Sequence, residues 1–412
     1  MKLLSRLRVL IVTSWYPNKT NPIYGTFVRE QAQALAKNHD VEVALFYPSD
    51  PEVQTKARQE NSSAASGSLT VSGEVVSRLE EGVKTYRANL RFSGNPLKYL
   101  KGGFLAGREL KKIIRLFKPD IIHVHVSFPA GILTDFATLG MSIPYVITEH
   151  MSYLQEYTDK PPYRILLKHA FERAAKVLVV SPFLATQFQS LNWKVSPEYF
   201  PNVVDTSRFQ LSINEPKNKK ADAVNILFIG GMDQREVKGL QYLLPAFAEV
   251  YKEFAEVHLE SRDNKKPHLH LVGDGEKRSA YEQLVQDLGM SDHCTFYGAL
   301  PPEDMPQMYN QCDFLVLSSL KETFGVVLIE ACACGKPVVS TACGGPETIV
   351  TDEVGILVEK ENIQALAEGL RQMTNSYKDY SPEAIRTYAV NNYSSQVISQ
   401  KLISLYQKVI SS

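Results

Sequence analysis

Short apolar runs of strand length alternate with helical patterns along the whole chain, and no other feature constrains the fold as much. This alternation is typical of βαβ units, in which helices cover a parallel sheet. Strands are predicted in the first half over residues 8–13, 41–47, 120–126, 145–148 and 176–181, and in the second half over 225–230, 268–273, 295–297, 313–318, 337–340 and 356–358. Each half is therefore expected to form a doubly wound α/β sheet of its own.

Length, charge and cysteine content narrow the class of protein further. A chain of 412 residues exceeds one usual domain, so we expect two, with the crossover at Tyr199–Asp205. The formal net charge is zero and gives no reason to expect a nucleic acid partner. The five cysteines fit no common zinc spacing, and a reducing compartment is expected. No apolar run reaches the ~20 residues that a membrane span requires. The apolar run that begins at Val9 is too short for the hydrophobic region of a signal peptide, so we expect a cytoplasmic protein.

The stretch Lys321–Glu330 joins an expected strand to a helix expected to begin near Phe324, and it carries Glu322 and Glu330. A helix that begins there points free N–H groups at the carboxyl edge of the sheet, where phosphate binds. Glu330, about two turns into the helix, can accept hydrogen bonds from a ribose diol. The backbone groups expected to meet the phosphates belong to Phe324, Gly325 and Val326. The stretch therefore indicates a site for a nucleoside diphosphate sugar, and two solvated glutamates are the alternative.

This stretch resembles the Glu-x7-Glu motif of the retaining glycosyltransferases of family 4, the group 1 type that acts in bacterial polysaccharide and cell-surface glycan synthesis. Segments in matching order extend the resemblance over nearly the whole chain. The resemblance implies the α/β fold called GT-B, with two doubly wound Rossmann-like domains that face each other across a cleft. It places an acceptor-side domain at residues 1–203, with a final helix at 393–412 packing back on it, and a donor-binding domain at residues 204–392. Glu322 would contact the donor sugar and Glu330 the ribose.

Further donor-side residues follow the other expected strands of the second half. Gly230 precedes Lys238, and the resemblance implies that Lys238 is one of two cations that hold the departing diphosphate. The family has an arginine directly after the first glycine, whereas this chain has Gly231 there, so Arg235 is the candidate replacement. Gly273, at the end of another expected strand, is also expected to bind the donor, and the resemblance implies that the segment around Phe296 lines the nucleotide base. Such cations can stabilise a leaving diphosphate without a metal, and no Asp-x-Asp metal motif lies in a suitable loop.

The strand ends of the first half carry the other expected site residues. Gly25 and Thr26 open a helix, and they match a family loop that closes over the donor diphosphate and the acceptor. His123 and His125 alternate onto one strand face, where a histidine is more often a core residue than a zinc ligand. His125 resembles the family histidine beside the reactive centre. His150, after the next strand, is expected on the acceptor side.

The segment Asn95–Lys118 contains seven cations and one acid, together with apolar residues at helical spacing. Two interpretations stay open for this helix. One is a solvated basic surface of the first domain. The other is docking on anionic lipid headgroups at the inner face of a membrane.

The resemblance implies a glycosyltransferase that moves a sugar from a nucleotide diphosphate sugar to an acceptor hydroxyl with retention, in surface polysaccharide or glycolipid synthesis. It would need no cofactor and no metal, and its catalytic residues would be His125, Lys238 and Glu322. A GT-B nucleotide-sugar 2-epimerase and a non-catalytic nucleotide-sugar-binding protein are the two alternatives, and the presence of both glutamates argues against the second. Nothing in the sequence selects the donor base, the sugar, the acceptor or the oligomeric state.

Overall fold

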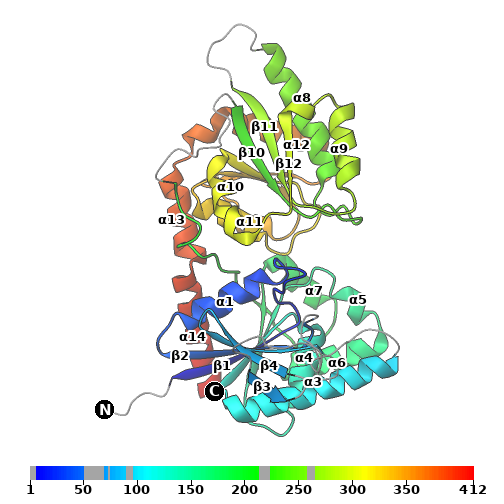
Figure 1. Ribbon diagram of the computed structural model, residues 1–412, viewed down its shortest axis with the longest axis vertical. Helices are drawn as coiled ribbons and strands as arrows, with labels where there is room; N and C mark the ends of the chain where they lie inside the picture. The colour runs from blue at the N-terminus through cyan, green and yellow to red at the C-terminus, as the bar shows by residue number, and fades with distance from the viewer. Residues whose placement is uncertain (1–5, 51–68, 73–74, 90–95, 213–222, 258–264) are drawn as a thin grey trace. The chain divides into compact units, whose positions relative to one another are not determined.

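The computed structural model describes residues 6–50, 69–72, 75–89, 96–212, 223–257 and 265–412. Contacts divide the chain into two compact units, each built around one sheet (Figure 1). The first unit holds residues 1–180, 184–203 and 395–412, and the second holds 181–183 and 204–394.

The first unit has a sheet of nine strands in the order β3-β4-β5-β2-β1-β6-β7-β8-β9. The strands are β1 (Leu7–Thr13), β2 (Val41–Tyr47), β3 (Leu69–Ser72), β4 (Val75–Glu80), β5 (Val83–Ala88), β6 (Ile121–His125), β7 (Tyr145–Glu149), β8 (Lys176–Val179) and β9 (Glu198–Tyr199). The helices are α1 (Thr26–Ala36), α3 (Pro96–Phe117), α4 (Ser127–Ala137), α5 (Gln155–Thr158), α6 (Pro161–Arg173), α7 (Pro182–Gln189, its first two residues in the second unit) and α14 (Ser395–Ser411). Pairing is parallel from β5 through β9 and antiparallel in the β3-β4-β5 extension.

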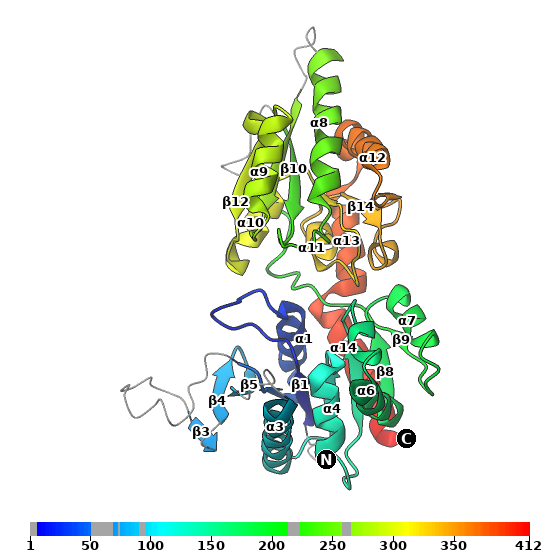
Figure 2. The ribbon, with the colours of Figure 1, turned by 90° about the vertical axis from the view of Figure 1, so that its right-hand side faces the viewer.

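The second unit has six strands, all parallel, in the order β12-β11-β10-β13-β14-β15. The strands are β10 (Ala223–Ile229), β11 (Lys266–Val272), β12 (Cys294–Gly298), β13 (Phe314–Leu317), β14 (Val338–Ala342) and β15 (Gly355–Glu359). The helices are α8 (Leu240–Val257), α9 (Arg278–Asp287), α10 (Met305–Gln311), α11 (Val326–Ala333), α12 (Ile363–Ser376) and α13 (Pro382–Tyr393). In Figure 2, α8 and α12 lie side by side, and both contribute to one apolar cluster with β10.

All eleven predicted strands are present, with ends that differ by up to two residues. The sequence did not predict β3, β4, β5 and β9, which lie towards the edges of the first sheet. β4 and β5 contain polar residues among their apolar ones, and β9 has only two residues, so they lack the continuous apolar run of a buried parallel strand. β3, β4 and β5 pair with one another in succession, and β5 joins the rest of the sheet through β2, which is distant in the sequence.

The predicted final helix over residues 393–412 is wrong at its start. The helical conformation is interrupted at Ser394, which forms a parallel β-bridge with Val204. The carbonyl of Tyr393 accepts a hydrogen bond from the Val204 N–H at 2.9 Å. α13 therefore ends before the break and α14 begins after it. α14 then shares the apolar cluster of α1 and β1 in the first unit, with Leu402 and Tyr406 fully buried.

Candidate active site

In the second unit, the start of α8 is held against the end of β13. Gly239 has a φ of 71°, and a Cβ there would lie 1.9 Å from the carbonyl oxygen of Ser318, so only glycine fits. The Ser318 hydroxyl donates to the carbonyl of Lys238 at 2.9 Å, and the N–H of Leu320 donates to Val237 at 2.8 Å. These contacts bring the loop with Lys238 beside the loop with Glu322.

Lys238 and Glu322 form an ion pair at the carboxyl ends of β10 and β13. The Lys238 Nζ donates to Glu322 Oε2 at 2.7 Å, and the two side chains are 30% and 18% exposed. Burial alone would lower the pKa of Lys238, but the Glu322 carboxylate offsets this effect, and the pKa ends above its usual value. The ammonium group is therefore positively charged at neutral pH. The sequence places these residues 84 positions apart, so their pairing was not predictable from spacing.

The backbone around Glu322 is fixed by the loop after β14. The Glu322 N–H donates to Cys343 at 3.3 Å, and the Gly345 N–H donates to the Glu322 carbonyl at 2.8 Å. The Glu347 carboxylate accepts from the Gly344 N–H with both oxygens, at 3.0 and 2.9 Å. This loop therefore sets the position of the Glu322 carboxylate, a role that the sequence reasoning missed.

α11 begins at Val326, two positions later than the predicted start near Phe324. Gly325 precedes it with a left-handed φ of 95°, and Phe324 is buried with 1% exposure. The prediction that Glu330 lies about two turns into the helix is therefore wrong, because it lies only a little more than one turn in. Its Oε2 accepts a 2.6 Å hydrogen bond from the hydroxyl of Tyr309 on α10. Tyr309 was not predicted, since nothing in the local sequence connects it to Glu330.

The remaining donor-side candidates lie in the second unit, in or after the strands β10, β11 and β12. The Gly230 N–H donates to Val272 at 3.0 Å and the Gly273 N–H donates to Gly298 at 2.8 Å, so both glycines lie at adjoining strand ends. Phe296 is half-buried and packs against the apolar cluster of the second unit. Arg235 differs in its exposure. Its side chain is 71% exposed and forms an ion pair with Asp233 at 3.8 Å, and its backbone N–H donates to the same carboxylate at 2.9 Å.

In the first unit, Gly25 and Thr26 start α1 beneath the loop that follows β1. Gly25 has a φ of 71°, and a Cβ there would lie 2.5 Å from the carbonyl oxygen of Trp15, so a side chain would displace this loop. Trp15 contacts the rings of Phe27 and Tyr153, at centroid distances of 6.2 Å each. This aromatic cluster was not predicted.

Three histidines lie together at the carboxyl ends of β6 and β7. The Nδ1 atom of His123 is hydrogen-bonded to the hydroxyl of Tyr406 at 2.5 Å, and its Nε2 atom to the hydroxyl of Thr148 at 2.7 Å, so both ring nitrogens have partners. His125 Nδ1 lies 3.1 Å from His150 Nε2. As predicted, His123 and His125 lie on the same face, with ring centroids 4.1 Å apart.

The His125–His150 pair retains two buried nitrogens, His125 Nε2 and His150 Nδ1, that have no hydrogen-bond partner among the described residues. Burial lowers the pKa of His125 to about 3, and burial and then His125 lower that of His150 well below its usual value. Both rings are therefore neutral. Whichever ring donates within the pair, one of these two nitrogens is left as a donor and the other as an acceptor. Such a pair suits a hydroxyl group.

Glu149 holds this region in place. Its carboxylate accepts from the N–H groups of Ser127, His150 and Met151 at 3.2, 2.8 and 2.9 Å. Burial raises its pKa, although these hydrogen bonds counteract the effect. Within the described ranges, no group of three His, Cys, Asp or Glu side chains is arranged to hold a metal ion.

Two family models match the chain in succession. Glycosyltransferase Family 4 matches residues 24–208, and Glycosyl transferases group 1 matches residues 210–391. Two Rossmann-like units with a cation–carboxylate pair at a strand edge agree with these matches. The chain belongs to the group 1 glycosyltransferases of family 4, and it has the GT-B fold.

Relatives and a solved structure extend these matches. N-acetyl-alpha-D-glucosaminyl L-malate synthase of Bacillus anthracis is 28% identical over 299 residues, which cover 70% of this chain and 74% of that one. The putative teichuronic acid biosynthesis glycosyltransferase TuaC of Bacillus subtilis strain 168 is 26% identical over 370 residues, 88% of each chain. Anabaena Alr3699/HepE, solved in complex with UDP and glucose, has a TM-score of 0.70 and 18% identity, over 98% of this chain and 100% of that one. At this identity, the structural likeness supports the fold alone.

Proposed function

We propose that this protein transfers a sugar from a nucleoside diphosphate sugar to an acceptor hydroxyl with retention of the anomeric configuration, without a metal ion or other cofactor. The Lys238–Glu322 pair beside the start of α11 is the observation that carries this proposal. A positive side chain and free helix N–H groups at one strand edge suit a diphosphate. UDP in the Anabaena structure, on the same fold, supports a nucleotide donor of this class.

In the proposed reaction, the bond between the anomeric carbon and the diphosphate breaks, and a bond from the acceptor oxygen to that carbon forms on the same face. The proton of the acceptor hydroxyl passes to an oxygen of the leaving diphosphate. Lys238 and the N–H groups at Gly325 and Val326 offset the charge that develops on this group. Glu322 binds the donor sugar and Glu330 the ribose. The neutral His125–His150 pair hydrogen-bonds a sugar hydroxyl.

We further propose a role in surface polysaccharide or glycolipid synthesis, at the inner face of a membrane. The likeness to the teichuronic acid relative supports a surface glycan. The basic α3 supports a membrane surface, because five cations between Arg108 and Lys118 accompany one acid, Glu109. Glu109 is buried and already pairs with Arg108 and Lys112. In the described part of the chain, no helix is both long and apolar enough to cross a membrane.

A donor panel tests the enzymatic proposal. The full-length protein is incubated with UDP-, GDP- and ADP-linked sugars and with lipid and soluble acceptors, and products are followed by NMR. We expect one donor to yield a product with the anomeric configuration of the donor, at the same rate with and without EDTA. An inverted product would contradict retention, and loss of activity in EDTA would contradict metal independence. Epimerised donor without transfer would identify an epimerase, and donor binding without turnover a binding protein.

A second prediction concerns the ribose contact. Glu330→Gln replaces a charge-assisted hydrogen bond with a neutral one, so it should weaken nucleotide binding by about 1–2 kcal/mol. Tyr309→Phe removes the hydroxyl that donates to Glu330, and it should weaken binding by a smaller amount in the same direction. Isothermal titration with the preferred nucleoside diphosphate measures both.

The control is the same nucleotide without its ribose hydroxyls. Both variants should bind this analogue as the unmodified protein does, because the contact that they impair is missing from the ligand. If Glu330→Gln leaves the affinity for the complete nucleotide unchanged, the ribose assignment is wrong. If the two variants lose affinity equally for both ligands, Tyr309 and Glu330 only maintain the fold around the site.

A further inference from the structure

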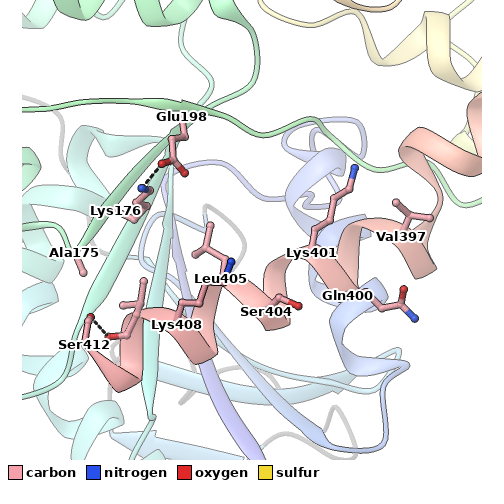
Figure 3. Close-up of a pocket in the computed structure, with 11 residues that line it drawn as sticks. Ala175, Lys176, Glu198, Val397, Gln400, Lys401, Ser404, Leu405, Lys408 and Ser412 are labelled. Carbon is pink, nitrogen blue, oxygen red and sulfur yellow. Dashed lines mark hydrogen bonds and ion pairs between the residues drawn. The ribbon is translucent and has the colours of Figure 1, made fainter.

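Two hollows in the first unit lie away from the residues described above. One, of about 780 Å³, runs along α14 and is lined by Lys176, Glu198, Lys401 and Lys408 (Figure 3). Lys176 and Glu198 pair with each other there, and both α14 lysines are exposed. Its lining is that of a solvated surface, and it serves below as a control.

The other hollow is an apolar groove of about 560 Å³ between α3, α4 and α6. We call it the α3–α4 groove and define it by Phe104 and Gly107 of α3, Ile132 and Phe136 of α4, Leu139 after α4, and Tyr163 of α6. Three of these side chains are exposed to an unusual degree for large apolar groups: Phe104 at 73%, Phe136 at 49% and Leu139 at 46%. Its volume is in the range of sites that bind small molecules.

Positively charged side chains lie next to the apolar wall of this groove, on the same face of α3. Arg108 and Lys111 are themselves part of its lining. Phe104, Arg108, Lys111 and Arg115 follow one another at spacings of four, three and four, so they share one helix face. The opposite face, with Leu110 and other buried apolar residues, packs into the unit. The groove therefore combines an apolar wall with positive charge at one side, which complements a ligand that has a hydrocarbon chain and an anionic head.

The wall that α3 contributes is open because two of its residues are glycines. A Cβ built on Gly103 or Gly107 meets no atom within 4 Å. Glycine inside a helix lowers its stability, and no steric contact with the rest of the protein requires it at these positions. The two glycines leave free the space in which a chain would lie.

We propose that the α3–α4 groove binds the hydrocarbon chain of a phosphate-bearing lipid of a bilayer, while Arg108, Lys111 and Arg115 contact phosphate groups at the bilayer surface. This inference rests on the membrane part of the proposed function and is independent of sugar transfer. A bilayer supplies both the chain and the anionic head, and it matches a segment whose cations far outnumber its acids in a protein of zero net charge.

Photolabelling of the full-length protein tests this. Vesicles of phosphatidylcholine are prepared alone and with phosphatidylglycerol that carries a diazirine on an acyl chain. After illumination, we expect labelled peptides to come from α3 and α4, at the residues around Phe104 and Phe136. Labelling confined to other segments, or no labelling of bound protein, would overturn the proposal.

Two variants separate the chain from the charges. Gly107→Leu places a side chain in the open space, raises helix propensity, and should abolish the label in α3 and α4 without lowering the melting temperature. Arg108→Gln, Lys111→Gln and Arg115→Gln together should weaken vesicle binding on the order of 100-fold, since each cation contributes about fivefold. High salt should have the same effect on the unmodified protein. Unchanged labelling in Gly107→Leu would contradict the groove as the site.

The matched control is Lys401→Gln with Lys408→Gln in the α14 hollow, which should leave vesicle binding unchanged. An equal loss of vesicle binding in this control would mean that any exposed lysine contributes to binding, and it would contradict the proposal. Sedimentation without lipid tests a second copy as the occupant, because a dimer that Gly107→Leu dissociates would overturn the lipid proposal. Turnover with a soluble acceptor is measured in parallel. Turnover without groove labelling would reject only this inference, and labelling without turnover would reject only the transferase proposal.

Discussion

Lys238→Ala is expected to lower turnover by about 100- to 1,000-fold while donor affinity changes much less. The reason is that the charge on a departing nucleoside diphosphate develops mainly in the transition state, so a cation that meets it stabilises that state more than bound substrate. The Ser318 hydroxyl holds the backbone carbonyl of Lys238, and Glu322 raises the pKa of the Lys238 side chain although burial acts to lower it. Steady-state kinetics with the donor identified by the panel measure kcat and KM separately.

A matched control is available in the same unit. Lys277 is 32% exposed and pairs with Glu236 at 3.7 Å, so Lys277→Ala removes an equally exposed, paired lysine. It should retain turnover, and both variants should remain folded by circular dichroism. Turnover of Lys238→Ala within a few-fold of the unmodified protein would remove Lys238 from the proposed mechanism.

Arg235→Ala tests whether Arg235 is the second cation that holds the leaving diphosphate. A comparable loss of turnover there would assign it this role despite its pairing with Asp233.

Acidification from pH 7 to pH 5 should destabilise the protein strongly because of its buried histidines. The pKa values of His123, His125 and His150 are all lowered by burial, that of His125 to about 3. An unfolded histidine has a pKa of about 6.5, so below this pH the unfolded chain binds more protons than the folded one and stability falls. His125 should cost about 2 kcal/mol over this interval, and His123 and His150 should add to this loss. Urea unfolding at both pH values measures the loss.

Variants assign this loss to the buried rings. His125→Gln with His150→Gln retains polar groups but cannot be protonated, so the loss between pH 7 and pH 5 should shrink by more than the ~2 kcal/mol of His125 alone. His39 is exposed, and His39→Gln should leave the pH dependence unchanged. An equal pH dependence in the double variant and the unmodified protein would show that the histidines are not buried and neutral as the structure describes them.

Local pattern was enough to predict the class of fold and the strands that carry the candidate site residues. Apolar runs such as Val41–Tyr47 are buried on both faces, so their strands can be recognised without knowledge of their neighbours. The helix that starts after Gly25 was also predictable, because a tight turn before a helix has its own local sequence signature. Resemblance then supplied roles for Lys238, Glu322 and Glu330, and these roles are still predictions.

Contacts between distant segments could not be predicted in this way. β5 joins the parallel part of the sheet by pairing with β2, and the break at Ser394 depends on its bridge to Val204. Tyr309 reaches Glu330 from another helix across 21 positions. In each case the determining interaction joins residues that no local period connects.

The order of apolar residues was enough to predict two α/β units, because burial on both faces of a parallel sheet leaves a direct record in that order. The family 4 type followed from the resemblance of the motifs. The ion pair between Lys238 and Glu322 and the buried hydrogen bond between His125 and His150 became visible only in the folded structure. The folded structure also showed that the exposed Phe104 lies in a groove beside Arg108 and Lys111. Charge state and burial depend on which groups meet in space, and the chain must fold before they meet.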